Sequence, residues 1–392
     1  MKVFIIILIF SLILVCCQNA NKKYDNQIKT FNLKELPKIT SVKLTDLNFA
    51  NIEYIPLETN EQSLIKRINE IKVGNGFFLI QFYTTILKFR TDGSFVAKIG
   101  NKGRGPNEFL FANDVDIDTK NQNIYIVSGV SNKFYVYSEV GEFIRTFQSP
   151  LKTSNFIFTE DGILCYSKNF WGNIENSYNL IDTAGRIIKV FPNKFPWLKS
   201  KKSTADFTEN LFYRFNNRIL KKEVYSDTVY AFENLEFSPH LVIEQGERLL
   251  TTQSRSKMID EDLFKYFIDQ ENLFEFGDYI YFELQYDFRI GGNNIYRGLI
   301  ASKKNKFQAL INSHQGFIND LDGGPNIRPE TIKDDNTIIA WVDALQLKQQ
   351  IASEKFKNFT PKYPENKKKL EKLGNSLSET DNPVLILVKL KE

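Results

Sequence analysis

Charged residues that could bind or transform a ligand are concentrated in two glycine-containing segments, 100–108 and 314–324. A histidine can act as a general acid or base near neutral pH, and carboxylates can share that role or hold a cation. Arginine adds a planar donor for carboxylate or phosphate groups. The candidate ligand-contacting residues of the two segments are Arg104, Glu108, His314, Asp320 and Asp322. Both segments stand between strand-like runs, so we expect them in loops, where side chains are free of packing.

Each candidate also has a purely structural explanation. A histidine at position 314 can be exposed or simply hydrogen-bonded, and an aspartate can stabilise its own turn. Asp320 and Asp322 are followed by two glycines, but a calcium loop of the EF-hand type needs more oxygen ligands and a distal glutamate. The same argument applies to the alternating carboxylates Asp114, Asp116 and Asp118. We therefore expect no metal site.

Known catalytic and cofactor motifs are absent from the sequence. His240 and His314 are the only histidines, and neither HExxH nor GxSxG occurs. The segment 100–106 is rich in glycine, but it lacks the Gly-Lys-Ser/Thr that opens a helix in phosphate-binding loops. We expect it to connect two strands through positive φ angles. No cofactor is expected.

The N-terminus is typical of an exported protein. Lys2 precedes an apolar run, 3–15, that only Ser11 interrupts and that is too short to remain in a bilayer as a spanning helix. We expect a signal peptide over residues 1–16. A buried N-terminal strand or helix is the alternative, but a core segment would show polar positions on one face.

Two adjacent cysteines follow this apolar run. The sequence Leu-Val-Cys-Cys at 14–17 resembles the lipobox of bacterial lipoproteins, whose cysteine is acylated and becomes the new N-terminus. Cys17 is the expected lipid attachment site because Cys16 is the smaller residue to precede the cut. Cys16 is the alternative. The resemblance implies a membrane partner through the lipid, with the body extracytoplasmic, either periplasm-facing or at the outer membrane.

Composition restricts the remaining chain. Cys165 lies in an apolar strand-like run and is expected to be a buried structural thiol, so no internal disulfide is predicted. The net charge is only +4 with acids and bases interspersed, which argues against a nucleic-acid partner. The 34 Phe and 17 Tyr against 2 Met favour sheet over helix.

A four-strand unit repeats along the chain. Residues 113–147 contain four short strands separated by tight turns, and residues 67–99 show the same order. Gly93, Gly141 and Gly185 mark the last turn of three successive units. Self-similarity of this period with four strands per unit is typical of propeller blades. Weaker units at 212–237, 274–310 and 337–390 bring the number of blades to six, although the period alone would also allow five or seven.

The remaining segments complete this interpretation. Residues 17–48 are polar and are expected to be a lipid-anchored tether, with one propeller over 49–392. Residues 257–273 and 344–373 have helical spacing and are expected to be insertions between strands. The strand-like run 51–57 is expected at the outer edge of the final blade, beside the apolar strand 382–390, so that both termini close the ring.

Four segments carry a family resemblance, at 53–59, 99–109, 319–325 and 381–385. Through them the chain resembles the six-bladed β-propeller lipoproteins of Bacteroidota-type bacteria, which are similar in shape to NHL-repeat propellers. The family usually has glycine where this chain has Asn107, so the turn there can differ. The resemblance implies an all-β fold with short helical insertions and no particular activity.

These observations lead to two functional hypotheses. The first is a non-enzymatic ligand-binding or scaffold protein of the cell envelope, whose channel mouth presents Arg104, Glu108 and the 314–322 segment to a glycan, a peptide or another envelope protein. The alternative is a hydrolase or lyase that acts on a glycan or lactone through carboxylates in the funnel. Facing carboxylates would be the sign of this second class.

Overall fold

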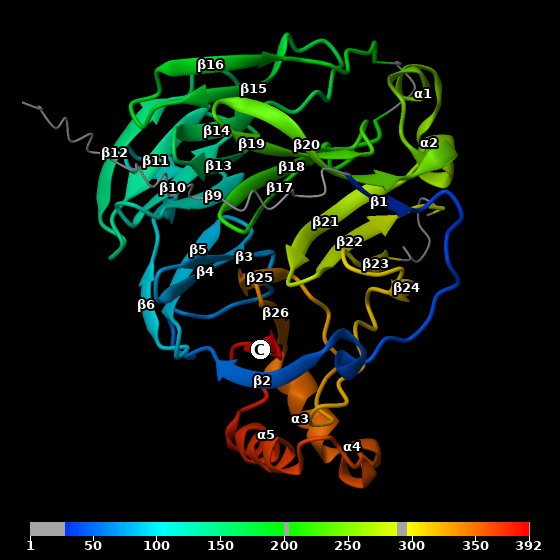
Figure 1. The fold of residues 1–392 in the computed structure, drawn as a ribbon. Helices are drawn as coiled ribbons and strands as arrows, with labels where there is room; N and C mark the ends of the chain where they lie inside the picture. The colour runs from blue at the N-terminus through cyan, green and yellow to red at the C-terminus, as the bar shows by residue number, and fades with distance from the viewer. Residues whose placement is uncertain (1–27, 200–203, 288–295, 392) are drawn as a thin grey trace, which may run out of the picture.

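The computed structural model describes residues 28–199, 204–287 and 296–391, and in these the chain forms a six-bladed β-propeller, as the sequence predicted (Figure 1). The predicted signal peptide, Cys16 and Cys17 lie outside the described residues. Each blade contains four antiparallel strands, and the chain runs from the innermost strand outward, except that the outermost strand of blade 6 comes from the start of the body. Innermost strands of neighbouring blades contact one another, and they therefore form the wall of a central channel.

The first three blades follow chain order from the channel outward. Blade 1 contains β3 (Glu70–Gly74), β4 (Phe77–Phe82), β5 (Thr85–Arg90) and β6 (Phe95–Lys98), blade 2 contains β9 (Asp114–Asp118), β10 (Asn123–Ser128), β11 (Lys133–Tyr137) and β12 (Phe143–Gln148), and blade 3 contains β13 (Asn155–Thr159), β14 (Gly162–Tyr166), β15 (Asn176–Ile181) and β16 (Ile187–Pro192).

The other three blades include both ends of the described chain. Blade 4 contains β17 (Asn210–Phe215), β18 (Arg218–Glu223), β19 (Thr228–Glu233) and β20 (Glu236–Glu244), blade 5 contains β21 (Asp269–Phe276), β22 (Tyr279–Gln285), β23 (Tyr296–Ser302) and β24 (Gln308–Asn312), and blade 6 contains β25 (Thr331–Asp334), β26 (Thr337–Val342), β27 (Val384–Leu390) and, outermost, β2 (Phe49–Pro56).

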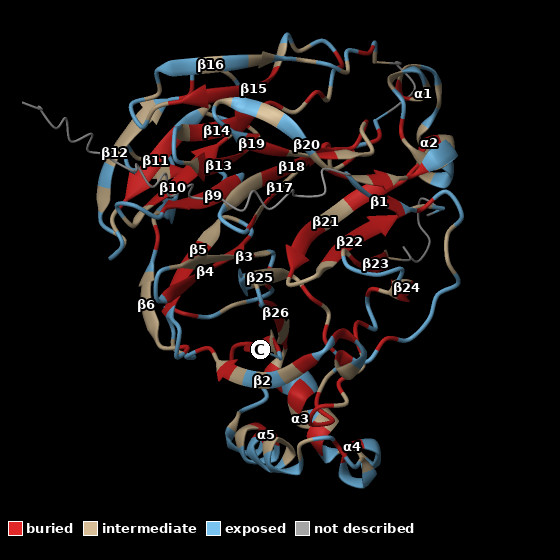
Figure 2. Ribbon diagram, in the orientation of Figure 1, coloured by how far each residue is buried: buried red, intermediate tan, exposed pale blue. Residues whose placement is uncertain are grey.

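Burial follows position within the blade. All six residues of β4 are buried, because both faces of a middle strand pack against neighbouring blades. Exposed residues gather on outermost strands such as β12 and β16 (Figure 2). Cys165 of β14 is fully buried as predicted, and burial raises the pKa of its thiol to about 12. The core is therefore the set of apolar layers between the blades.

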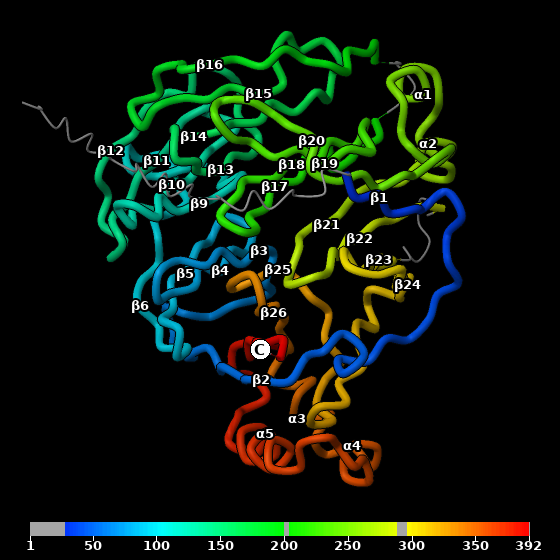
Figure 3. The backbone as a smooth tube through the Cα atoms, viewed as in Figure 1, coloured from blue at the N-terminus to red at the C-terminus, as the bar shows by residue number. Residues whose placement is uncertain are grey.

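The ring is closed by strands from both ends of the chain. β2 pairs antiparallel with β27, from Phe49 opposite Leu390 to Pro56 opposite Val384. Because β27 also pairs with β26, it lies in the middle of blade 6. Val388 of β27, for example, is opposite Ile52 on one side and Ile338 on the other, two residues that are far apart in the sequence. The sixth blade thus joins the two ends of the body, as the tube of Figure 3 shows.

The segment preceding β2 differs from the expected tether. β1 (Lys29–Asn32) pairs in parallel with the outer edge of β20, which gives blade 4 a fifth strand. Phe31 and Leu33 are buried in the core, and a short 3₁₀ helix η1 (Leu44–Leu47) packs with them. The polar composition hid these contacts, because β1 buries only one of its four side chains.

Helices occupy two insertions. The first contains the 3₁₀ turn η2 (Gly246–Arg248), α1 (Thr252–Lys257) and α2 (Asp260–Tyr266), so the predicted helix over 257–273 ends early and its last residues already belong to β21. The second contains α3 (Ala344–Ala352), α4 (Glu354–Asn358) and α5 (Pro364–Ser376), and it projects from blade 6 (Figure 1). None of the helices among the described residues is long and apolar enough to cross a membrane.

Candidate functional site

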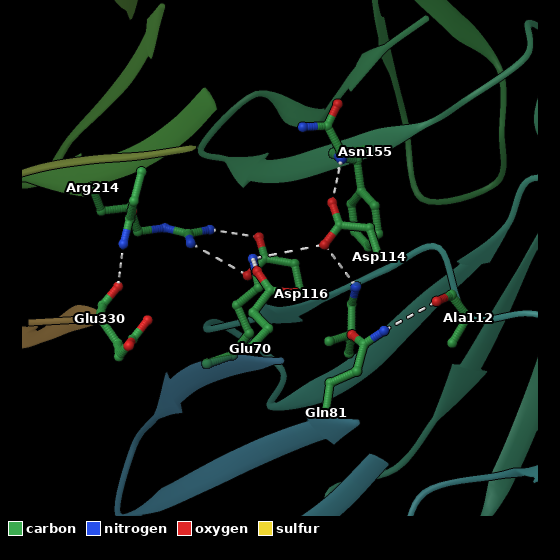
Figure 4. Close-up of polar contacts among 12 residues, drawn as sticks. Glu70, Gln81, Ala112, Asp114, Asp116, Asn155, Arg214 and Glu330 are labelled. Atoms are coloured by element: carbon green, nitrogen blue, oxygen red, sulfur yellow. Dashed lines mark hydrogen bonds and ion pairs between the residues drawn. The ribbon is translucent and has the colours of Figure 1, made fainter. Parts of the chain in front are cut away.

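The first group of charged residues on the channel wall joins blades 1, 2 and 4 (Figure 4). Lys72 Nζ lies 2.7 Å from Glu70 Oε1 and 3.7 Å from Asp114 Oδ1. Asp116 forms a two-point ion pair with Arg214, whose Nη2 is 2.7 Å from Oδ2 and whose Nη1 is 3.3 Å from Oδ1. Alternation along β9 directs both aspartates the same way.

These aspartates also hold blade 3. Asp114 Oδ2 accepts the backbone N–H of Phe156 at 2.8 Å, and Asp116 Oδ2 accepts that of Phe158 at 2.8 Å. Burial raises the pKa of Asp114 to about 7, against the opposing effect of Lys72. Burial would also raise the pKa of Asp116, but Arg214 and Lys72 outweigh it and hold this pKa below its usual value. Both carboxyls therefore connect blades.

The second group lies where blades 5 and 6 meet. Arg328, just before β25, places Nη2 3.0 Å from Glu283 Oε1 and Nε 3.4 Å from Glu330 Oε1. Ser313 donates to Glu283, and Gln285 donates to Glu271 on the neighbouring strand. We call Glu271, Glu283 and Glu330, together with Arg328, the acidic site.

Carboxyl pKa values are shifted strongly upward around the acidic site. Burial raises the pKa of Glu271 to about 7, with Glu283 adding to the shift, and burial likewise raises that of Glu330 to about 7. Asp269, at the start of β21, reaches about 8 through burial and the proximity of Glu271. Arg328 opposes the shifts of Glu271 and Glu330 without cancelling them. Such shifts are frequent at functional sites.

Solvent reaches both groups. The side chains of Arg214 and Arg328 are 39% and 37% exposed, and that of Glu330 is 28% exposed. By contrast, Glu283 is almost fully buried beneath Arg328. Arg328 and Glu330 can therefore be reached from solvent, whereas Glu283 cannot. Among residues 28–199, 204–287 and 296–391, no three metal-ligating side chains come together as a metal centre.

The loop at 100–108 lies between blades 1 and 2. Arg104 is exposed, whereas Glu108 turns back and accepts the N–H of Gly105 at 2.9 Å. A Cβ at position 103 would meet Glu108 Oε2 at 1.8 Å, so a larger residue there would displace the Glu108 side chain. Two short parallel strands, β7 (Asn101–Lys102) and β8 (Glu108–Phe109), close the loop. The carboxylate of Glu108 thus stabilises its own loop.

The segment 314–322 is divided between two environments. His314 is exposed and stacks edge-on against Tyr296, 4.8 Å between ring centroids. Asp320 accepts from the hydroxyl of Thr45 at 2.5 Å, and fully buried Asp322 accepts from Asn319 at 2.7 Å and Gly324 at 2.9 Å. No described contact joins this segment to the loop of Arg104, so the structure does not bring the five candidates into one site.

Sequence reasoning missed the acidic site. The three glutamates of the acidic site are far apart in the sequence and lie in or beside strands. A charged residue that alternates with apolar residues in a strand is normally predicted to face solvent. The available signal was a glutamate inside the apolar run 279–285, which becomes the buried Glu283.

A family model matches nearly the entire described body. It covers residues 28–389 and is described as a domain of unknown function, DUF4934. The chain belongs to the DUF4934 family. No curated protein matches the sequence.

One solved structure supports the fold of this DUF4934 protein. The chain is similar to an exported protein from Bacteroides fragilis at 18% identity and a TM-score of 0.69, over 93% of this chain and 99% of that one. A member of the DUF4221 family from Bacteroides vulgatus shares 10% identity, with a TM-score of 0.49, over 88% of this chain and 97% of that one.

Proposed function

We propose that this protein is an extracytoplasmic, lipid-anchored propeller that binds a cationic peptide segment at the acidic site, without a chemical reaction. The location rests on the N-terminal signal and lipobox, and on the likeness to a protein described as exported. The binding class rests on the carboxyls beside the channel.

The anchor would hold the body close to the membrane. β1 fixes the chain at Lys29 on the edge of blade 4. Cys17 precedes it by twelve residues, which span about 40 Å at full extension. An acyl group on Cys17 would therefore keep the propeller within about 40 Å of the lipid surface, facing the periplasm or at the outer membrane.

The observation that carries the binding proposal is an imbalance of charge. Arg328 pairs with Glu283 and Glu330, whereas Glu271 has no cation within ion-pair distance among the described residues. A guanidinium or ammonium group from a ligand would complete the pairing, because charge-assisted hydrogen bonds to carboxylates are strong where water is partly excluded. Of the ligands that the fold allows, a peptide with basic side chains suits this site better than a neutral glycan.

The test uses the full chain and two peptides of equal length. We expect acetylated, amidated tetra-arginine to bind saturably in calorimetry and tetra-glutamine not to bind. The Glu271→Gln and Glu330→Gln double variant should weaken tetra-arginine binding about tenfold or more, because two charge-assisted pairs are lost. A matched control, Glu354→Gln with Glu365→Gln on exposed helical sites, should bind like the unmodified chain.

The opposite results would remove the proposal. Equal affinity in the acidic-site variant and in the helical control would mean that tetra-arginine binds elsewhere. Binding of tetra-glutamine with similar affinity would mean that charge is not what the site recognises.

A second candidate function is hydrolysis or lysis of a glycan or lactone. The raised pKa values of Glu271 and Glu330 would provide a protonated acid beside Glu283, the carboxyl that pairs with Arg328. Turnover of aryl-glycoside or lactone reporters, lost on Glu330→Gln but retained in the helical control, would favour this function over simple binding.

A further inference from the structure

A cavity separate from the channel lies between blades 3 and 4. It has a volume of about 320 Å³ and opens between the outer halves of the two sheets. Its walls are aromatic, with further contributions from three lysines and two glutamates: Tyr178, Phe191, Phe195, Tyr230, Phe237, Lys189, Lys194, Lys221, Glu223 and Glu236. Cavities of this size and character hold small molecules in other proteins.

The floor of the cavity is a buried ion pair. Lys221 donates to Glu223, and the two side chains are 5% and 6% exposed. The ammonium of Lys221 also faces three rings, 4.5 Å from the centroid of Tyr178, 4.9 Å from Tyr230 and 4.7 Å from Phe237. Removing a lysine and a carboxylate from water is costly, so a buried ion pair often stabilises a protein no better than apolar residues of similar size.

Comparison among the blades shows that the fold does not need this lysine. Five blades close their first hairpin through a two-residue turn, so their second strands can be aligned from that turn. In the other four blades of this kind, the position of Lys221 is occupied by a fully buried uncharged side chain: Ile80, Cys165, Phe282 and Ala340. Blade 4 departs from the pattern at the floor of the cavity.

A second cation approaches the same part of the cavity. Lys194 is exposed at the rim, and its ammonium lies 5.7 Å from the centroid of the Tyr230 ring that Lys221 also faces. No ion pair joins Lys194 to a carboxylate in the part of the chain that the structure describes. Since Glu223 balances Lys221, the net charge beside Tyr230 is positive.

We infer that this cavity binds a small molecule with a flat apolar body and one acidic group. The body lies against Phe237 and the other rings, and the anionic group lies beside Tyr230, between Lys194 and Lys221. Aromatic walls supply apolar contact area, and the two ammonium groups supply donors to the anion. The site is distinct from the acidic site, which favours cations.

Two probes with the same body and opposite charge test this inference on the full chain. We expect 2-naphthoate to bind saturably at one site in calorimetry, and 2-naphthylmethylammonium not to bind. Lys194→Glu should weaken naphthoate binding about tenfold or more by reversing the rim charge. Lys98→Glu, the same change on the exposed outer strand of blade 1, should leave the affinity unchanged.

A second variant removes the floor pair without leaving a lone charge. Lys221→Met with Glu223→Gln should fold with an unchanged or higher melting temperature, because uncharged replacements of a buried ion pair are tolerated. It should abolish saturable naphthoate binding. Should this variant not fold, the exposed Lys194→Glu change still decides the matter.

Three results would overturn the inference. They are no saturable naphthoate binding, equal binding of the ammonium probe, or unchanged naphthoate affinity in Lys194→Glu. The double variant Glu271→Gln with Glu330→Gln should bind naphthoate normally, so failure here and failure at the acidic site can be told apart.

Discussion

At the scale of single residues, burial separates carboxyls that maintain the structure from those that can meet a ligand. Asp322 is fully buried and accepts hydrogen bonds from Asn319, Gly324 and the hydroxyl of Tyr54, which lies 3.1 Å away. It fastens the loop before blade 6 to β2. Arg104, by contrast, is exposed to solvent and is not buried against neighbouring elements as Asp322 is.

Replacing Asp322 should therefore cost stability. Asp322→Ala removes the acceptor of the Tyr54 hydroxyl and of the buried Gly324 N–H, and we expect the free energy of unfolding to fall by about 2–4 kcal/mol in urea titrations. Arg104→Ala should change it by less than about 0.5 kcal/mol. Equal effects of the two changes would show that Asp322 is not a structural tie.

Residue chemistry was only partly predictable from the sequence. The buried thiol of Cys165 followed from its apolar neighbours, since its whole strand had to be internal. The partners of Asp320 did not, because Thr45 lies 275 positions away in the chain. Such a contact depends on how the ring closes, which local patterns do not encode.

At the scale of elements, the strands from the two ends of the body differ in how much of the fold depends on them. β27 stands between β2 and β26 and is buried at six of its seven positions. β1 adds to a blade that already has four strands. Removing β27 should open the ring, whereas removing β1 should only expose the edge of β20.

This contrast can be measured with two truncations of the full chain. Loss of 384–392 should abolish the cooperative thermal transition, because a central strand and its apolar layer disappear. Loss of 18–33 should leave a cooperative transition with a melting temperature lower by about 5 °C or more, reflecting the buried Phe31 and Leu33. A C-terminal truncation that still melts cooperatively would contradict the role given to β27.

Element boundaries were predictable where one period dominated. The units at 67–99 and 113–147 match β3–β6 and β9–β12, because alternation and turn glycines agree there. The predicted helix over residues 257–273 was too long. Leu263, Phe267 and Ile268 have helical spacing, but strand β21 already begins at Asp269. Pairing with β22 overrides local spacing in the final residues of that segment.

At the scale of the whole molecule, the propeller combines two sites of opposite preference. The net charge of +4 gives cations no general attraction to the protein, so tetra-arginine binding would depend on the local excess of carboxylates. The cavity between blades 3 and 4 carries the reverse charge. Repetition of one blade provided the scaffold, and departures from the repeat provided the candidate sites.

The pH dependence of tetra-arginine binding tests the central claim most directly. Arginine stays protonated throughout, so any change in affinity comes from the protein. Glu271 and Glu330 have pKa values of about 7 and Asp269 about 8, so these carboxyls are neutral below and charged above this range. Calorimetry should show affinity rising about tenfold or more from about pH 6 to about pH 8.5, and a much smaller rise for Glu271→Gln with Glu330→Gln. An affinity that is constant with pH, or that rises equally in the variant, would contradict the acidic site as the place of binding.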